Sequence, residues 1–69
     1  MITYVVVVEG TERSFSAYSP DLPGCVTAGD SREETLELMR EAIALHLAGL
    51  REDGEPIPPA TSTAEYITV

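Results

Sequence analysis

The sequence is short of the residues that stabilise small domains through cross-links or bound metal. Its 69 residues include one cysteine, Cys25, and one histidine, His46. A single cysteine excludes an internal disulfide, and two such ligands are too few for a structural zinc site, which takes four. A chain of this length buries only about 60% of its unfolded surface. We therefore predict no metal or cofactor and expect oligomerisation to add stability.

Basic residues are also scarce. Four lysines and arginines stand against twelve aspartates and glutamates, which gives a net charge of −8. Such a surface repels a phosphate backbone, so direct nucleic-acid binding by this chain is not expected. The same charge steers a basic protein towards the chain, which makes a basic protein the favoured partner.

Long apolar runs and leader-like segments are missing. No apolar stretch reaches the roughly 20 residues that a membrane-spanning helix needs. Met1 leads directly into a strand-like run, without the positively charged region that opens a signal peptide. We therefore predict a cytoplasmic protein that does not enter a membrane.

No local arrangement of side chains indicates an enzyme. Glu41 and His46 are five residues apart, so on a helix their side chains diverge. Glu33, Glu34, Glu37 and Glu41 resemble a metal or acid–base cluster, but Arg40 lies between Glu37 and Glu41 on the outer helix face, which favours a solvated charged face instead. No glycine-rich phosphate loop occurs. Pairing of His46 with a distant nucleophile stays open, and the prediction is a protein without catalytic activity.

The remaining patterns predict an α+β fold in a single domain over residues 1–69. β-branched and aromatic residues, bounded by turn residues, indicate strands. The predicted strands cover about residues 2–9, 14–19, 25–28 and 64–68. Pro23-Gly24 suits the centre of a type II turn, where glycine adopts a positive φ.

One helix is predicted over about residues 31–52. Asp30 or Ser31 can serve as the N-cap, and Ser31 and Glu34 have the spacing of a capping box. Gly54 suits the residue just beyond the helix end. Apolar residues at three- and four-residue spacing form a core stripe, which consists of Leu36, Met39, Ile43, Leu47 and Leu50. A second line of mostly apolar residues lies beside it, namely Thr35, Leu38, Ala42, Leu45 and Gly49.

This second line gives the helix more apolar surface than one sheet covers. The first strand likewise has apolar residues on both faces, Val5 and Val7 among them. Either the loops and residues 55–62 cover this surface, or the chain self-associates. We favour a homo-oligomer, a dimer or tetramer, with Leu38, Leu45, Val5 and Val7 as candidate interface residues.

Four motifs together give the sequence a specific resemblance. They are "PDLPGC" at 20–25, "TAGDSREE" at 27–34, "EAIALHL" at 41–47 and "GEPIPP" at 54–59. With the N-terminal "YVVVVE" strand, this pattern resembles the HicB-like (UPF0150) family of antitoxins from type II toxin–antitoxin systems. Thr35 stands where the family usually has alanine, which is a minor departure.

The resemblance implies a partial RNase H-like fold, with a three-stranded antiparallel sheet, a C-terminal strand and one helix on one face. It also implies binding and neutralisation of HicA, a small basic toxin that cleaves mRNA. Many family members carry a C-terminal DNA-binding domain, and no basic segment follows the last predicted strand here. We therefore expect a short form without that domain, which puts DNA-dependent autoregulation in doubt.

The candidate contacts to a toxin are a predicted outward-facing turn and the polar helix face. These residues are Asp21, Leu22, Glu33, Glu37 and Glu41. An ordinary turn and a solvated face explain each of them as well. The alternative function is a solitary HicB-like oligomeric scaffold or small-ligand module that has no toxin.

Overall fold

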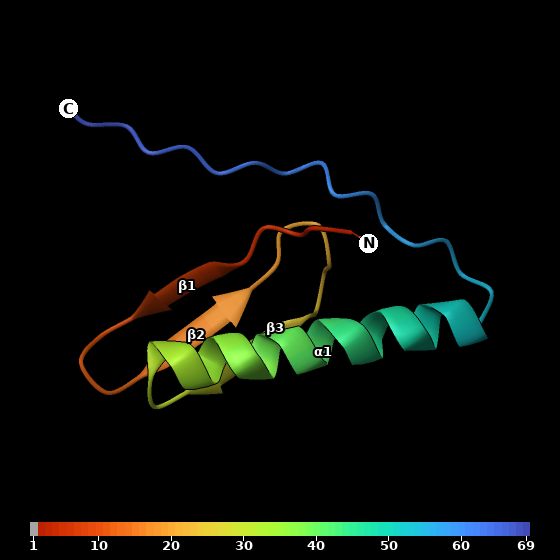
Figure 1. Cartoon of the computed structure of the whole chain (residues 1–69), viewed down its shortest axis with the longest axis horizontal. Helices are drawn as coiled ribbons and strands as arrows, with labels where there is room; N and C mark the ends of the chain where they lie inside the picture. Colours follow the sequence, from red (N-terminus) through yellow and green to blue (C-terminus); the bar gives the residue numbers. More distant parts are fainter. Residues whose placement is uncertain (1) are drawn as a thin grey trace.

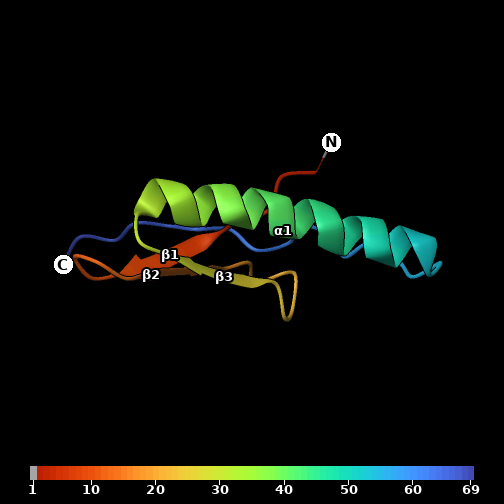
Figure 2. The ribbon, with the colours of Figure 1, turned by 90° about the horizontal axis from the view of Figure 1, so that it is seen from below.

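A computed structural model describes residues 2–69 as a three-stranded antiparallel sheet with one helix on one face (Figures 1 and 2). The predicted α+β class is confirmed. The elements follow the chain as β1 Val7–Gly10, β2 Phe15–Tyr18, β3 Val26–Gly29 and α1 Arg32–Glu52. The strand order is β1-β2-β3, so β2 is central and β1 forms one edge. None of the helices among residues 2–69 is long and apolar enough to cross a membrane.

Strand β1 is shorter than the predicted strand over 2–9. Its ladder with β2 begins at the pair Val7–Tyr18 and ends at Gly10–Phe15. Two residues after Tyr18, at the end of β2, the chain reaches Pro20, which has no amide hydrogen to donate. The Ser19 hydroxyl instead donates to the Val5 carbonyl oxygen at 2.9 Å. The β1–β2 ladder therefore ends at Tyr18, before Pro20.

Both predicted ends of the helix are confirmed. At the start, the Glu34 amide donates to the Ser31 hydroxyl oxygen at 3.0 Å. At the end, the Glu55 amide donates to the Leu50 carbonyl at 2.8 Å. Gly54 has a φ of +69°, as expected for the left-handed residue that closes a helix. The caps thus fix the length of α1 at 21 residues.

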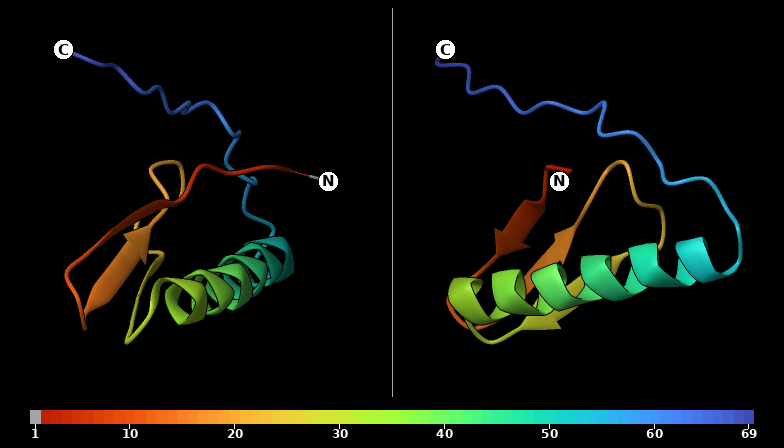
Figure 3. Two further views of the ribbon diagram at one scale, coloured as in Figure 1. Left: turned by 60° about the vertical axis from the view of Figure 1, so that its left-hand side comes forward. Right: turned by 45° about the vertical axis from the view of Figure 1, so that its right-hand side comes forward.

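α1 is much longer than the strands that it covers. At about 1.5 Å per residue the helix spans roughly 31 Å, whereas a four-residue strand spans only about 13 Å. The C-terminal half of α1 therefore extends past the sheet and over the loop between β2 and β3 (Figure 3). One buried core extends under both the sheet-covering half and the overhanging half of α1. Its apolar members are Ala17, Leu22, Cys25, Met39 and Leu47.

After α1 the chain turns back and runs extended along the β1 side of the molecule (Figure 1). Ile57 packs against the core, and the Tyr4 hydroxyl donates to the Pro58 carbonyl oxygen at 2.6 Å. The strand predicted over 64–68 is wrong for this structure, because these residues belong to no strand. They diverge from β1 instead of joining its hydrogen-bonding ladder.

Candidate functional site

The predicted polar face of the helix carries exposed carboxylates. Glu33, Glu37 and Glu41 are all exposed on α1, and we refer to them as the acidic helix face. Arg40 Nε lies 3.6 Å from Glu37 Oε2, and both side chains are largely exposed. An exposed pair of this kind contributes little stability, at most about 1 kcal/mol. The acidic helix face therefore remains accessible to a partner.

Asp21, in the loop between β2 and β3, holds the C-terminal segment. Its carboxylate accepts hydrogen bonds from the backbone amides of Thr61 and Ser62, each at 3.0 Å. It also accepts bonds from the two hydroxyl groups, at 3.1 and 2.9 Å. The Ser62 amide is the main cause of a lowered pKa for the Asp21 carboxyl, because the bonds favour its charged form. Asp21 therefore contacts its own chain in this structure, and its role as a toxin contact stays a prediction.

The outward position predicted for Leu22 is wrong. Its side chain is only 1% exposed and belongs to the core cluster. The Cys25 amide donates to the Leu22 carbonyl at 3.1 Å, and Gly24 between them has a φ of +82°. This turn folds Leu22 under the overhanging half of α1, which the sequence pattern did not anticipate. Leu22 therefore presents no side-chain surface to a partner.

The apolar candidates for self-association differ in exposure. Leu45 is 74% exposed and Leu38 is 36% exposed, both on α1. Val5 and Val7 are half-buried. Their assignment to an oligomer interface stays a prediction.

Sequence reasoning missed two further apolar residues, Tyr18 and Val26. Ala17 is buried towards α1, so Tyr18 beside it points to the opposite face of the sheet. Val7 and Val26 are its partners across the ladder on either side. The alternation of the "FSAY" strand was the signal that could have placed Tyr18 there. The far face of the sheet thus carries the apolar row Val7, Tyr18 and Val26.

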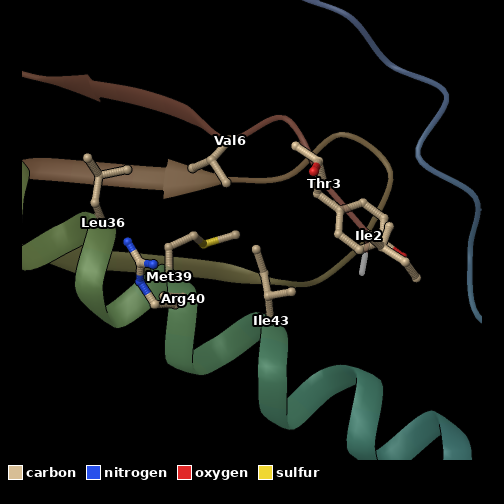
Figure 4. Close-up of a pocket in the computed structure, with 8 residues that line it drawn as sticks. Ile2, Thr3, Val6, Leu36, Met39, Arg40 and Ile43 are labelled. Carbon is tan, nitrogen blue, oxygen red and sulfur yellow. The ribbon is translucent and has the colours of Figure 1, made fainter.

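A groove lies between the N-terminal segment and α1 (Figure 4). Its volume is about 350 Å³, and Met39 and Ile43 form its helix side. Val6 lies opposite, and Arg40 adds one positive charge to an otherwise mainly apolar lining. The sequence contained no motif for this groove, because its two walls come from segments 30 or more residues apart.

Cys25 is the one thiol of the sequence and is buried in the core. Burial raises the pKa of its thiol, which keeps the group protonated and unreactive at neutral pH. Within residues 2–69, no three histidine, cysteine, aspartate or glutamate side chains lie close enough together to hold a metal ion. The prediction of a chain without metal or cofactor stays a prediction.

Comparison with known proteins adds the family. The sequence model of the HicB-like antitoxins of bacterial toxin–antitoxin systems matches residues 4–69. A UPF0150 protein of Thermoplasma acidophilum is 36% identical over 67 residues, which cover 96% of this chain and 94% of that protein. The protein named Antitoxin HicB 2 of Photorhabdus laumondii is 33% identical over 67 residues, covering 96% of this chain and 48% of that protein.

A third relative is an uncharacterised protein of Haemophilus phage HP1, which is 34% identical over 64 residues. The match covers 93% of this chain and 48% of the phage protein. The chain thus spans about half the length of the phage protein and of the Photorhabdus antitoxin. No solved structure matches it. The family match over residues 4–69 and the relatives that align with nearly all of the sequence establish that this chain belongs to the HicB-like antitoxin family of bacterial toxin–antitoxin systems.

Proposed function

We propose that this chain binds and neutralises a small basic toxin of the HicA type, an mRNA interferase that acts in the cytoplasm. The observation that carries the proposal is the acidic helix face, which offers exposed carboxylates on a rigid 21-residue helix. A toxin that cleaves RNA must itself attract phosphate, so its RNA-binding surface is basic. Binding of the acidic helix face to that surface blocks RNA by charge and by bulk.

The proposal assigns the chemistry to the toxin and only binding to this chain. The buried thiol of Cys25 is a poor nucleophile, as its raised pKa indicates. The net charge of −8 also favours rapid association with a basic protein and disfavours contact with RNA. Self-association into a dimer or tetramer is part of the proposal, and it doubles or quadruples the number of acidic helix faces in one particle.

The test is copurification of this chain with the product of a neighbouring small basic reading frame. We expect a stable complex, and we expect toxin-dependent RNA cleavage to stop at a one-to-one ratio of the two chains. Growth arrest caused by the toxin alone is expected to be relieved by coexpression. Absence of binding to such a neighbour contradicts the proposal.

The acidic helix face is tested separately by reversing charge. Glu37→Lys with Glu41→Lys changes the net charge from −8 to −4, because each substitution adds two positive charges. The matched control is Glu12→Lys with Glu55→Lys, which has the same net charge but changes exposed residues outside α1. We expect the helix variant to associate about tenfold more slowly at low salt and the control to change much less. Equal slowing of both variants removes the acidic helix face from the proposal.

The groove beside α1 favours a second candidate function, a toxin-independent small-ligand module. Its volume of about 350 Å³ lies at the lower end of the range of ligand sites, and the Arg40 guanidinium suits a small molecule with one anionic group. Titration of aliphatic carboxylates of increasing length, followed by NMR shifts of Met39 and Ile43, tests this function. The matched change Arg40→Gln is expected to weaken binding; unmoved signals across the series exclude the function.

A further inference from the structure

The last seven residues, "TAEYITV" at 63–69, have the composition of a strand but no partner strand in this structure. Tyr66 is 100% exposed and Ile67 is 82% exposed, and Val69 is also fully exposed. β-branched and aromatic residues are favoured where a pleated surface covers them, and a strand gains stability by pairing its backbone amides and carbonyls. The segment thus has the features of a strand that pairs with something else.

An open strand edge lies next to this segment. The sheet order is β1-β2-β3, so one side of β1 carries no neighbouring strand among residues 2–69. A groove of about 350 Å³ separates that side from the C-terminal segment. Val5–Val8 and Ala64–Tyr66 line the groove, and so does Arg32 at the start of α1. An unpaired edge with an apolar wall is a natural acceptor for a further strand.

The direction of the segment limits what fits in this groove. Residues 63–69 run in the same general direction as β1 and diverge from it towards Val69 (Figures 1 and 3). A strand placed between them in the opposite direction is antiparallel to both neighbours. A two-fold axis through the groove reverses the direction of the C-terminal segment. The same segment of a second copy therefore has the required direction.

We propose that two copies of this chain exchange residues 63–69, each inserting them into the groove between β1 and the C-terminal segment of the other. The combined sheet begins with β3, β2 and β1 of the first copy, followed by residues 63–69 of the second copy. Residues 63–69 of the first copy come next, and β1, β2 and β3 of the second copy complete the sheet. Three strands of each copy and the two exchanged segments form this sheet, and every neighbouring pair in it is antiparallel. This inference rests on the proposed self-association and identifies its interface.

Asp21 prepares the segment for exchange. Its carboxylate holds Thr61 and Ser62 through four hydrogen bonds, immediately before the exchanged residues. Tyr4 and Pro58 fix the chain a little earlier. The segment therefore leaves the body of the protein at a defined point and in a defined direction. Less conformational freedom is lost on pairing than for a free terminus, which favours association.

The central test changes the backbone of the segment without touching the core. Glu65→Pro with Ile67→Pro removes two amide donors from exposed residues, so folding of the monomer is expected to persist. The matched control is Leu38→Glu with Leu45→Glu, which disrupts the alternative interface on α1. We expect sedimentation equilibrium to give a dimer for the unchanged chain and the helix variant, and at least tenfold weaker association for the proline variant.

The outcomes separate the two levels of the proposal. A monomer at about 100 μM for the unchanged chain contradicts self-association and, with it, the strand exchange. A dimer that survives the proline changes but not the helix changes overturns the exchange and leaves self-association through α1. Toxin binding is scored on the same variants, so that loss of the dimer is distinguished from loss of the proposed antitoxin function.

A second measurement distinguishes exchange between copies from pairing within one copy. Isotope-labelled and unlabelled chains are mixed, and NMR contacts between labelled and unlabelled molecules are selected. We expect contacts of the Tyr66 ring and Ile67 methyl groups with Val5–Val8 of the other molecule. If residues 63–69 contact β1 only within their own molecule, the exchange is wrong.

Discussion

The loop between β2 and β3 and the C-terminal segment show opposite relations between residue type and burial. Residues 19–25 contain two prolines and a glycine, as surface turns do, yet Leu22 and Cys25 are part of the core. Residues 63–69 have the composition of a buried strand, yet Tyr66 and Ile67 are exposed. Composition determined the local shape in both regions. What lies opposite each region determined its burial.

The difference follows from the length of α1. The overhanging half of the helix lies beside the loop that leaves β2 (Figure 3). Leu22 and Cys25 of this loop belong to the same core cluster as Leu47 of the helix. Residues 63–69, by contrast, only border an open groove beside β1 and leave Tyr66, Ile67 and Val69 exposed. The first region is therefore buried within its own chain, whereas the second exposes apolar side chains.

The largest effect expected from this comparison is the difference in stability between Leu22→Ala and Ile67→Ala. Loss of the buried Leu22 side chain leaves a cavity and is expected to lower the free energy of unfolding by about 2–5 kcal/mol. Ile67→Ala, measured at a concentration where the chain is monomeric, is expected to change it by less than about 0.5 kcal/mol. Urea denaturation followed by circular dichroism measures both. Similar losses for the two variants contradict the contrast in burial.

A smaller effect is expected from two matched glycine changes. Gly24 has a φ of +82°, so Gly24→Ala is expected to cost about 1–2 kcal/mol through backbone strain. Gly49 lies within α1 with open space around it, so Gly49→Ala is expected to stabilise by about 0.5–1 kcal/mol. Thermal unfolding shows whether each glycine substitution lowers or raises the stability. If Gly24→Ala also stabilises, the turn does not constrain the loop.

The attachment of the C-terminal segment is tested by Tyr4→Phe. This change removes the hydroxyl that donates to the Pro58 carbonyl and is expected to cost about 1 kcal/mol. Tyr66→Phe is the control, because the side chain of Tyr66 is fully exposed. The difference in unfolding free energy between the two variants is the measured quantity. No difference indicates that water replaces the Tyr4 bond at no cost.

The most local effect concerns pH. Because the pKa of Asp21 is lowered in the folded protein, its stabilising bonds are fully present above the ordinary pKa of 3.8. They are lost as the pH falls through the lower folded pKa. We expect the NMR shifts of the Thr61 and Ser62 amides to report this titration, and Asp21→Asn to abolish it. A transition at the ordinary pKa, unchanged by the substitution, contradicts the assignment.

Much of the fold was predictable because its signals are local. Ser31 caps α1 through a bond to a residue three positions away, and Gly24 and Gly54 adopt positive φ values through their own lack of a side chain. The core stripe was also predictable, because helical periodicity places Met39 and Leu47 on one face. The exposure of Glu33, Glu37 and Glu41 follows from the same periodicity.

The sequence by itself therefore determined β1 to β3, α1 with its caps, the acidic helix face and the family. Only the tertiary structure decided that Leu22 is buried, that Asp21 holds Thr61 and Ser62, and that residues 63–69 stand away from β1. These features involve segments far apart in the sequence: Asp21 and Ser62 are 41 residues apart, and residues 63–69 lie more than 50 residues after β1. The burial of Leu22 also depends on how far α1 extends beyond the sheet. Local propensity carries no information about that distance, because it describes what a segment can form and not what lies opposite it.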